Sequence, residues 1–365
     1  MQNSAEHTRP GPIGDDDTPA FARLADLASV RVGGRTLDAS DDFFAPRSNL
    51  LKPEPPIFVP GKFTSRGKWM DGWESRRKRT PGHDWCVIRL GMRGVVRGVD
   101  VDTSFFVGNH PPQCSIDALD DARPLATSIA GRVGAPWVTV LVRSSLKGNS
   151  HNYFAIDPGG ADRADGMSDA SQHSPAWTHL RLNIHPDGGV ARFRAYGDVM
   201  VDWARFAKTR RSVDLAGIRN GGLVIAASDM HFGAVGNMIM PGRAANMGDG
   251  WETRRRRGPG HDWAVVRLGT PGLLTRIEID TNHFKGNYPD SASVDGCLAP
   301  GTDVPSADAA GWFPVLPQTR LRAHHRHLFS RELRPSGPVS HVRLNIFPDG
   351  GISRLRVHGI LAPAR

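Results

Sequence analysis

Apolar and polar residues alternate one by one along several short segments of the chain. The segments Cys86–Leu90, Leu180–Ile184 and Ile277–Asp280 each place an apolar side chain at every second position. A period of two, rather than 3.6, is typical of a β-strand that buries one face. The pattern therefore predicts strands, and few long helical patterns interrupt it.

Turn chemistry separates these strands. The runs HisProAspGlyGly at 185–189 and PheProAspGlyGly at 347–351 lie between alternating segments, and Pro followed by Asp-Gly is typical of a hairpin turn. Asp187 and Asp349 are accordingly interpreted as turn residues. Short strands joined by Gly- and Pro-containing turns indicate an all-β fold of the β-sandwich or jelly-roll type.

The chain contains two copies of one long pattern. Residues 71–91 (DGWESRRKRTPGHDWCVIRLG) match residues 249–269 (DGWETRRRRGPGHDWAVVRLG) at 16 of 21 positions without a gap. A period of well over a hundred residues implies tandem copies of a whole domain rather than a solenoid unit. We predict two tandem jelly-roll β-sandwich domains, with a short amphipathic helix in the linker. The predicted division is a disordered N-terminal tail (1–25), repeat 1 (26–197), a linker (198–213) and repeat 2 (214–365).

The charge balance narrows the functional classes. The 365 residues include 46 Lys+Arg against 37 Asp+Glu, a net charge of +9, which suits nucleic acid, anionic lipid or a small anionic substrate. No recognised nucleic-acid module accompanies the charge, and no stretch approaches the roughly 20 apolar residues that span a bilayer. We expect no nucleic-acid partner, no membrane association and a cytoplasmic location, which the three unpaired-looking cysteines (Cys86, Cys114, Cys297) also favour.

The duplicated Gly-, Pro- and charge-rich block is the first candidate site. It precedes a strand and is expected to form a loop, where a rigid sheet can present a carboxylate, guanidinium groups and an imidazole together. Histidine titrates near neutrality and can act as a general acid or base, while arginine matches carboxylates with paired donors. The candidates for catalysis are His83, Glu74 and Asp84 and their counterparts His261, Glu252 and Asp262.

A structural interpretation of the same block stays open. The His-Asp pair could simply hold the loop, and the arginines could form a solvated face. The large aromatic residues of the block are expected to pack in the core. These are Trp73, Trp85, Trp251 and Trp263.

Further polar residues recur in both copies at strand faces and strand ends, as substrate-binding candidates. Side chains that alternate with core residues, or that end a strand in a Gly-Asn turn, can reach a ligand, although the same residues also serve as solvent-facing or backbone-bonding groups. These candidates are Arg76, Arg89, Asp102, Asn109, Arg181 and Asn183, with Arg254, Arg267, Asp280, Asn287, Arg343 and Asn345 in the second copy.

The sequence predicts no cofactor. His325 and His327 have a spacing that suits metal ligands on one strand face, but no Cys or carboxylate accompanies them at a strong zinc spacing. A divalent metal is therefore an open alternative without support. The patterns GxSxG, GxxxxGKS and GxGxxG are absent from the sequence, which excludes the common serine-hydrolase, P-loop and dinucleotide sites.

From about residue 26 to 361 the chain resembles the allantoicase family. The resemblance rests on DDFFAPRSNLL, the DGWExRRxRxPGHDW block in both copies, DTSFFVGN with DTNHFKGN, and LNIHPDGG with LNIFPDGG. It implies two jelly rolls of the galactose-binding-like type, hydrolysis of allantoate to ureidoglycolate and urea, and a homo-oligomer. A guanidinium would then bind the substrate carboxylate, His83 or His261 would protonate the departing urea, and a neighbouring carboxylate would orient the acid or activate water.

Two questions stay open at the level of sequence. Repeat 1 keeps more polar groups near the shared motifs. His110, His185 and Lys68 stand at the positions that Tyr288, Phe347 and Asn246 take in repeat 2. This favours a site in repeat 1 or between the repeats. The competing class is a non-catalytic tandem jelly-roll module that binds a carbohydrate or another small anionic ligand.

Overall fold

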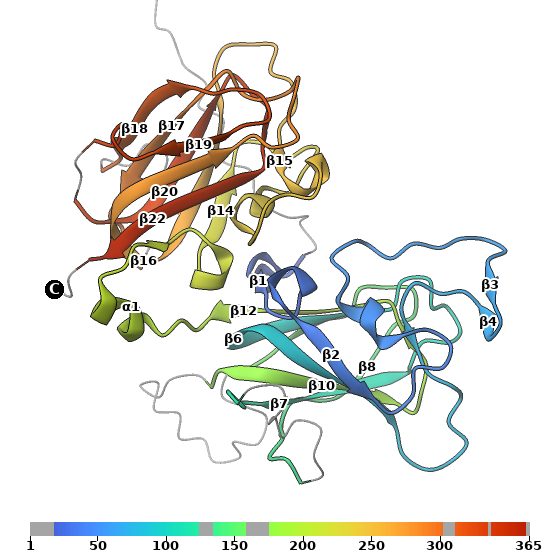
Figure 1. Cartoon of the computed structure of the whole chain (residues 1–365). Coiled ribbons are helices and arrows are strands. Elements are labelled where there is room, and N and C mark those ends of the chain that lie inside the picture. The colour runs from blue at the N-terminus through green and yellow to red at the C-terminus, as the bar shows by residue number, and fades with distance from the viewer. Residues whose placement is uncertain (1–17, 124–133, 158–174, 302–310, 335–336, 363–365) are drawn as a thin grey trace, which may run out of the picture. The chain divides into compact units, whose positions relative to one another are not determined.

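A computed structural model describes residues 18–123, 134–157, 175–301, 311–334 and 337–362. The described residues form two compact units, one comprising Thr18–Met200 and the other beginning at Val201 (Figure 1). The regular elements of each unit are mostly strands, as the alternating pattern predicts. Within the described residues, no helix combines the length and hydropathy needed to cross a bilayer.

The described residues of the first unit form short 3-10 helices and twelve strands. Its 3-10 helices are η1 (Ala20–Arg23), η2 (Val30–Val32) and η3 (Arg47–Leu51). Its strands are β1 (Ala25–Asp26), β2 (Arg35–Ala39), β3 (Phe63–Thr64), β4 (Gly67–Lys68), β5 (Trp73–Glu74), β6 (Asp84–Asp102), β7 (Gln113–Leu119), β8 (Val138–Ser145), β9 (Tyr153–Ala155), β10 (Trp177–His185), β11 (Gly189–Val190) and β12 (Arg192–Val199).

The second unit follows a similar order after one short α-helix, with η7 in the place of β3 and β4. Its helices are α1 (Trp203–Thr209), η5 (Ile218–Asn220), η6 (Val235–Ile239) and η7 (Met247–Asp249). Its strands are β13 (Val213–Asp214), β14 (Leu223–Ala227), β15 (Trp251–Glu252), β16 (Asp262–Asp280), β17 (Ser291–Cys297), β18 (Phe313–Arg320), β19 (Arg326–Phe329), β20 (Val339–Phe347), β21 (Gly351–Ile352) and β22 (Arg354–Leu361).

The segment predicted to be a disordered tail is partly structured. Residues 1–17 lie outside the described residues, but 18–25 include η1 and the start of β1. The ring of Phe21 lies 6.3 Å from the rings of both Tyr153 and Tyr196. This aromatic contact attaches the segment to the first unit, and a tail boundary at residue 25 is therefore wrong on its C-terminal side.

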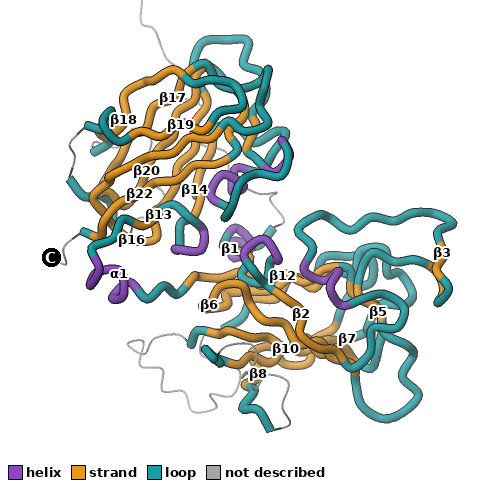
Figure 2. The backbone as a smooth tube through the Cα atoms, in the orientation of Figure 1, coloured by secondary structure: helices purple, strands orange, loops and turns teal. Residues whose placement is uncertain are grey.

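One long strand organises each unit. The strand order is β1-β12-β6-β10-β7-β8, with β2 and β9 also pairing with β6, and the second unit has the same order around β16 (Figure 2). The first half of β6 pairs with β10, where Asp84 faces Ile184, and the second half pairs with β12, where Asp102 faces Arg192. Because β10 and β12 are joined by the short segment 186–191, both ends of β6 lie at the same edge of the sandwich. The loops at this edge carry the duplicated block.

The core follows the alternation of the strands. On β10, Leu180, Leu182 and Ile184 have no exposed surface, whereas the residues between them face away from the core. Trp73 and Trp251 are also fully buried, and each indole N–H donates to a backbone carbonyl, of Asp41 or Asp229. Packing, rather than ligand contact, thus accounts for these two tryptophans.

Candidate functional site

A polar network lies on the outer face of the β6-β10-β7 sheet, opposite the core. In register, Asn183 of β10 lies between Trp85 of β6 and Ser115 of β7. The next outward residue of β10, Arg181, lies beside Asp117 of β7. The strand pairing therefore gathers these side chains in two neighbouring rows that lead toward the loop edge.

Asp117 is the centre of this network. Its Oδ2 accepts from Asn183 Nδ2 at 2.9 Å and from Arg181 Nε and Nη2 at 3.1 and 2.8 Å, and its Oδ1 accepts from Thr139 Oγ1 at 2.9 Å. Asn183 Nδ2 also donates to Ser115 Oγ at 3.2 Å. These bonds fix the orientation of the amide, and among the described residues no donor reaches the buried Asn183 Oδ1.

Two imidazoles lie at the loop end of the network. The ring of His83, which directly precedes β6, is 4.6 Å from the ring of His185, and His185 Nε2 is 3.1 Å from Ser115 Oγ. Burial, reinforced by the positive charges of His83 and Arg143, lowers the pKa of His185 to about 4. His185 is therefore neutral near pH 7, while the exposed His83 ring is accessible from solvent.

Glu74 bonds to Asn109 instead of His83. Asn109 Nδ2 donates to Glu74 Oε1 at 2.7 Å, across 35 residues of sequence. Burial raises the pKa of the Glu74 carboxyl, and the bond from Asn109 only partly opposes this. A carboxylate whose proton affinity is raised is suited to accept a proton from water.

Asp84 is held inside the loop. It is 2% exposed, and its Oδ1 accepts from Lys78 Nζ at 2.8 Å and from Ser40 Oγ at 2.9 Å. Lys78 is fixed in turn, because its backbone N–H donates to Asp187 Oδ2 at 2.8 Å. Asp84 was predicted to orient the neighbouring His83. Because its carboxylate already bonds to Lys78 and Ser40, the geometry favours a structural role instead.

The remaining first-repeat candidates are distributed around this edge. Arg76 donates to Asp41 through Nε at 2.7 Å and through its backbone N–H at 3.0 Å. Asp102 is 1% exposed, and its Oδ1 accepts from the backbone N–H of Ser104 at 2.8 Å, which is a strand-end bond. Arg89 lies one row below Arg181 on the outer face and is half-buried.

The second unit contains an equivalent network, in which Pro314 lies beside Asp295 where Thr139 lies beside Asp117. Asn345 Nδ2 donates to Asp295 Oδ2 at 2.8 Å and to Ser293 Oγ at 3.0 Å, and Arg343 Nη2 donates to Asp295 Oδ2 at 3.0 Å. At the position of His185 stands Phe347, whose ring lies 4.5 Å from that of His261.

His261 therefore has a different polar partner from His83. Its Nε2 lies 3.3 Å from Asn345 Oδ1. Burial lowers the pKa of the His261 imidazole, although the bond to Asn345 opposes the shift.

The second loop also repeats the first. Asn287 Nδ2 donates to Glu252 Oε1. Asp262 Oδ1 accepts from Ser228 Oγ at 2.9 Å and from Arg256 Nη2 at 2.5 Å, so an arginine replaces Lys78. The other second-repeat candidates lie at positions equivalent to those of the first: Arg254 with Asp229 at 3.6 Å, Asp280 at the strand end bonded to the N–H of Asn282, and Arg267 on the outer face.

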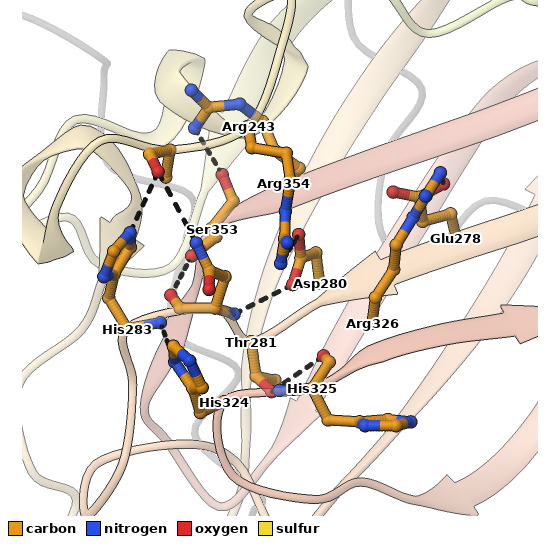
Figure 3. Close-up of polar contacts among 12 residues, drawn as sticks. Arg243, Glu278, Asp280, Thr281, His283, His324, His325, Arg326, Ser353 and Arg354 are labelled. Atoms are coloured by element: carbon orange, nitrogen blue, oxygen red, sulfur yellow. Dashed lines mark hydrogen bonds and ion pairs between the residues drawn. The ribbon is translucent and has the colours of Figure 1, made fainter.

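The histidines of 324–327 are engaged within the protein. Figure 3 shows His324 beside His283, whose backbone N–H donates to His324 Nδ1 at 2.8 Å. His325 Nε2 is 2.7 Å from Arg322 Nη2. His327 uses both ring nitrogens, on the carbonyl of Ile279 and the N–H of Arg322. In the part of the chain that the structure describes, no group of three or more His, Cys, Asp or Glu side chains forms a metal-ligand set.

Sequence reasoning missed the acidic centre of each network. Asp117 and Ser115 stand as Ser-Ile-Asp, and Asp295 and Ser293 stand as Ser-Val-Asp at the same offset as the matching tryptophans of the block. This repeated Ser-x-Asp on an alternating strand was a usable signal. It was overlooked because the segment carries no unusual composition.

The fold and the duplicated networks define a tandem jelly-roll protein with one polar cluster in each repeat. The family model "Allantoicase repeat" matches residues 25–200 and 213–362. The chain is 48% identical over 355 residues to probable allantoicase 1 of Burkholderia mallei, covering 96% of this chain and 98% of the relative. It is also 48% identical to probable allantoicase of Pseudomonas paraeruginosa over 345 residues, covering 94% and 98%. The crystal structure of allantoicase from Saccharomyces cerevisiae has a TM-score of 0.76 and 34% identity, covering 92% of this chain and 93% of that one. The chain belongs to the allantoicase family.

Proposed function

We propose that the protein hydrolyses allantoate to ureidoglycolate and urea. The observation that carries the proposal is the match of the allantoicase repeat to both halves of the chain. The chemistry of the outer-face network is compatible with this substrate, since allantoate bears one carboxylate and two ureido arms on a single carbon. The network supplies guanidinium, amide, imidazole and carboxylate groups within each repeat.

The reaction breaks one carbon–nitrogen bond and adds water to the same carbon. The nitrogen that leaves must gain a proton as the bond breaks, and the water that adds must lose one. We assign proton donation to the imidazole of the block, the exposed His83 in the first repeat or the half-buried His261 in the second. The proton balance then closes when a carboxylate accepts the proton of the water and returns it to the imidazole through solvent.

Glu74, or Glu252 in the second repeat, is the preferred carboxylate for this step. Asp84 is 2% exposed and bonded to Lys78 and Ser40, so it is not presented to a bound water. Glu74 instead has a raised pKa and an amide partner. The half-exposed Arg181 is assigned to the substrate carboxylate, because a guanidinium keeps unused N–H donors when one edge is bonded to Asp117.

Turnover tests the proposal directly. Purified, chelator-treated protein is incubated with allantoate, urea and the glyoxylate-forming product are followed, and the assay is repeated with divalent metal restored. Urea release in step with ureidoglycolate supports the proposal, and the response to metal decides whether a metal participates. A folded protein that binds allantoate and releases no urea under either condition would instead support a non-catalytic binding module.

Three finer expectations remain proposals. We propose a homo-oligomer, which is the commonest state of soluble assemblies, and light scattering tests it. We propose separate folding of repeat 1 (26–197) and repeat 2 (214–365), which limited proteolysis within 198–213 tests. We also propose a cytoplasmic location, which fractionation of the producing cell tests.

A further inference from the structure

We propose that His185 is a positioning residue that keeps the His83 imidazole free for proton transfer, and that repeat 1 is for this reason the catalytic copy. The inference rests on the proposed function and deepens it. It concerns a difference between two nearly identical sites in one chain, so each repeat serves as the control for the other.

In repeat 1 the imidazole of His185 is bonded to a side chain of β7. His185 Nε2 lies 3.1 Å from Ser115 Oγ, and this hydroxyl also accepts from Asn183 Nδ2 at 3.2 Å. A neutral His185 with its Nε2 bonded to Ser115 presents its ring edge and face to His83, 4.6 Å away between ring centroids. The charged groups that act on His185 are His83 and Arg143, which disfavour its protonation, and Asp117, which opposes them.

Repeat 2 shows what happens without that imidazole. Phe347 packs against His261 at 4.5 Å but offers no polar atom. His261 Nε2 lies instead 3.3 Å from Asn345 Oδ1. An amide oxygen only accepts, so His261 Nε2 must carry its proton as a donor to Asn345. That proton is held in a hydrogen bond within the protein and is not free for a substrate, and the His261 ring is half-buried.

The equivalent amide oxygen of repeat 1 is left without a donor. Asn183 Oδ1 is buried and accepts from no described residue, whereas Asn345 Oδ1 is reached by a loop imidazole. A buried acceptor without a donor is costly, and it is satisfied when a ligand supplies an N–H. The N–H groups of a ureido arm have this chemistry. We therefore propose that Asn183 Oδ1 accepts an N–H from one ureido arm of the substrate. If His83 turned inward as His261 does, its ring would take the place of that arm.

The test exchanges the two residues in the full-length protein. His185→Phe gives repeat 1 the aromatic residue of repeat 2, and Phe347→His is the matched control. We expect His185→Phe to lower kcat by about 10- to 100-fold, which is less than the roughly 100- to 10,000-fold contribution of a general acid because the imidazole is misplaced rather than removed. We expect Phe347→His to leave kcat unchanged within about twofold. The pH–rate profile should also change in His185→Phe, because the imidazole that donates the proton then lies against a phenyl ring and bonds to an amide oxygen, as His261 does in repeat 2.

Two results overturn the inference. One is wild-type kcat and pH profile in His185→Phe, and the other is loss of turnover in His261→Ala while His83→Ala remains active. A readout without turnover separates this inference from the proposed function. In NMR spectra at a fixed pH, with the ring signals of His83 assigned by His83→Ala, these signals should shift in His185→Phe because the ring changes its contacts. Unchanged His83 signals refute the positioning role even if allantoate is hydrolysed, whereas absence of urea release by the wild-type protein refutes only the proposed function.

Discussion

Replacing Asp117 with alanine tests whether the outer-face network supports both stability and catalysis. Asp117 accepts from Asn183, Arg181 and Thr139, so the Asp117→Ala substitution removes one acceptor from three donors at once. The three donors differ in how well they can replace the lost hydrogen bond. Asn183 is buried and keeps Ser115 as a weaker partner, whereas the Arg181 side chain is 33% exposed and can rehydrate.

The expected cost follows from these exposures. The partly screened Arg181 pair contributes about 1 kcal/mol at most. Weakening the hydrogen bonding of the buried Asn183 amide costs about 1 to 1.5 kcal/mol, and the half-buried Thr139 hydroxyl adds about 0.5 kcal/mol. The sum is about 2 to 3 kcal/mol. For a domain of this size each kcal/mol lowers Tm by about 2 to 4 °C, so the transition of repeat 1 should fall by about 5 to 10 °C.

Asp295→Ala provides the matched control in repeat 2. Asp295 accepts from Asn345 and Arg343 in nearly the same geometry, and the Arg343 side chain is 22% exposed, so a similar loss of stability is expected. Calorimetry measures both transitions, and urea release measures kcat below them. Only Asp117→Ala should lower kcat. Equal loss of kcat in both variants, or unchanged kcat in Asp117→Ala, would refute the argument that the repeat 1 network serves the reaction.

Three further predictions concern the rest of the molecule. A Cβ at Gly189 would lie 2.0 Å from the fully buried ring of Phe106, so Gly189→Ala should destabilise the first repeat by about 3 kcal/mol or more in denaturant unfolding, and a smaller effect would show that the ring relocates freely. The bond to Asp100 at 2.7 Å raises the pKa of His151 above its usual 6.5, so the stability contributed by the protonated imidazole is lost as pH rises through the raised pKa. The wild type should therefore be less stable at about pH 8 than at about pH 6, and His151→Gln should flatten this difference. The native protein should react slowly with a thiol reagent until denaturant is added, because burial raises the pKa of all three thiols (Cys86, Cys114, Cys297), and rapid labelling of the folded protein would contradict their burial.

The repeat and the all-β fold could be predicted because each follows from a pattern of residues that are close together in the sequence. Alternation with period two identifies strands without knowledge of their partners, and the 71–91 and 249–269 match reveals the duplication directly. The pairing of the block with the Pro-Asp-Gly-Gly turn could not be seen in this way. It places the N–H of Lys78 on Asp187, 109 residues away in sequence.

The candidate site was predicted only in part, for the same reason. The histidines and the strand-face arginine and asparagine lie near one loop edge, and their roles stay predictions, but their partners come from another strand. Asn183 meets Asp117 across 66 residues, and Glu74 meets Asn109 across 35. Sequence adjacency suggested that Asp84 would serve His83, yet the pleat directs Asp84 inward to Lys78.

The course of β6 through both sheets of its repeat has a consequence for how the protein opens. This one strand pairs with β2, β9, β10 and β12, so its backbone amides are protected by partners on both sides of the sandwich. A fluctuation that detaches either sheet alone still leaves half of the strand bonded. The whole of 84–102 is therefore released only when the repeat opens completely, and hydrogen exchange that is equally slow in both halves of the strand would report that cooperative opening.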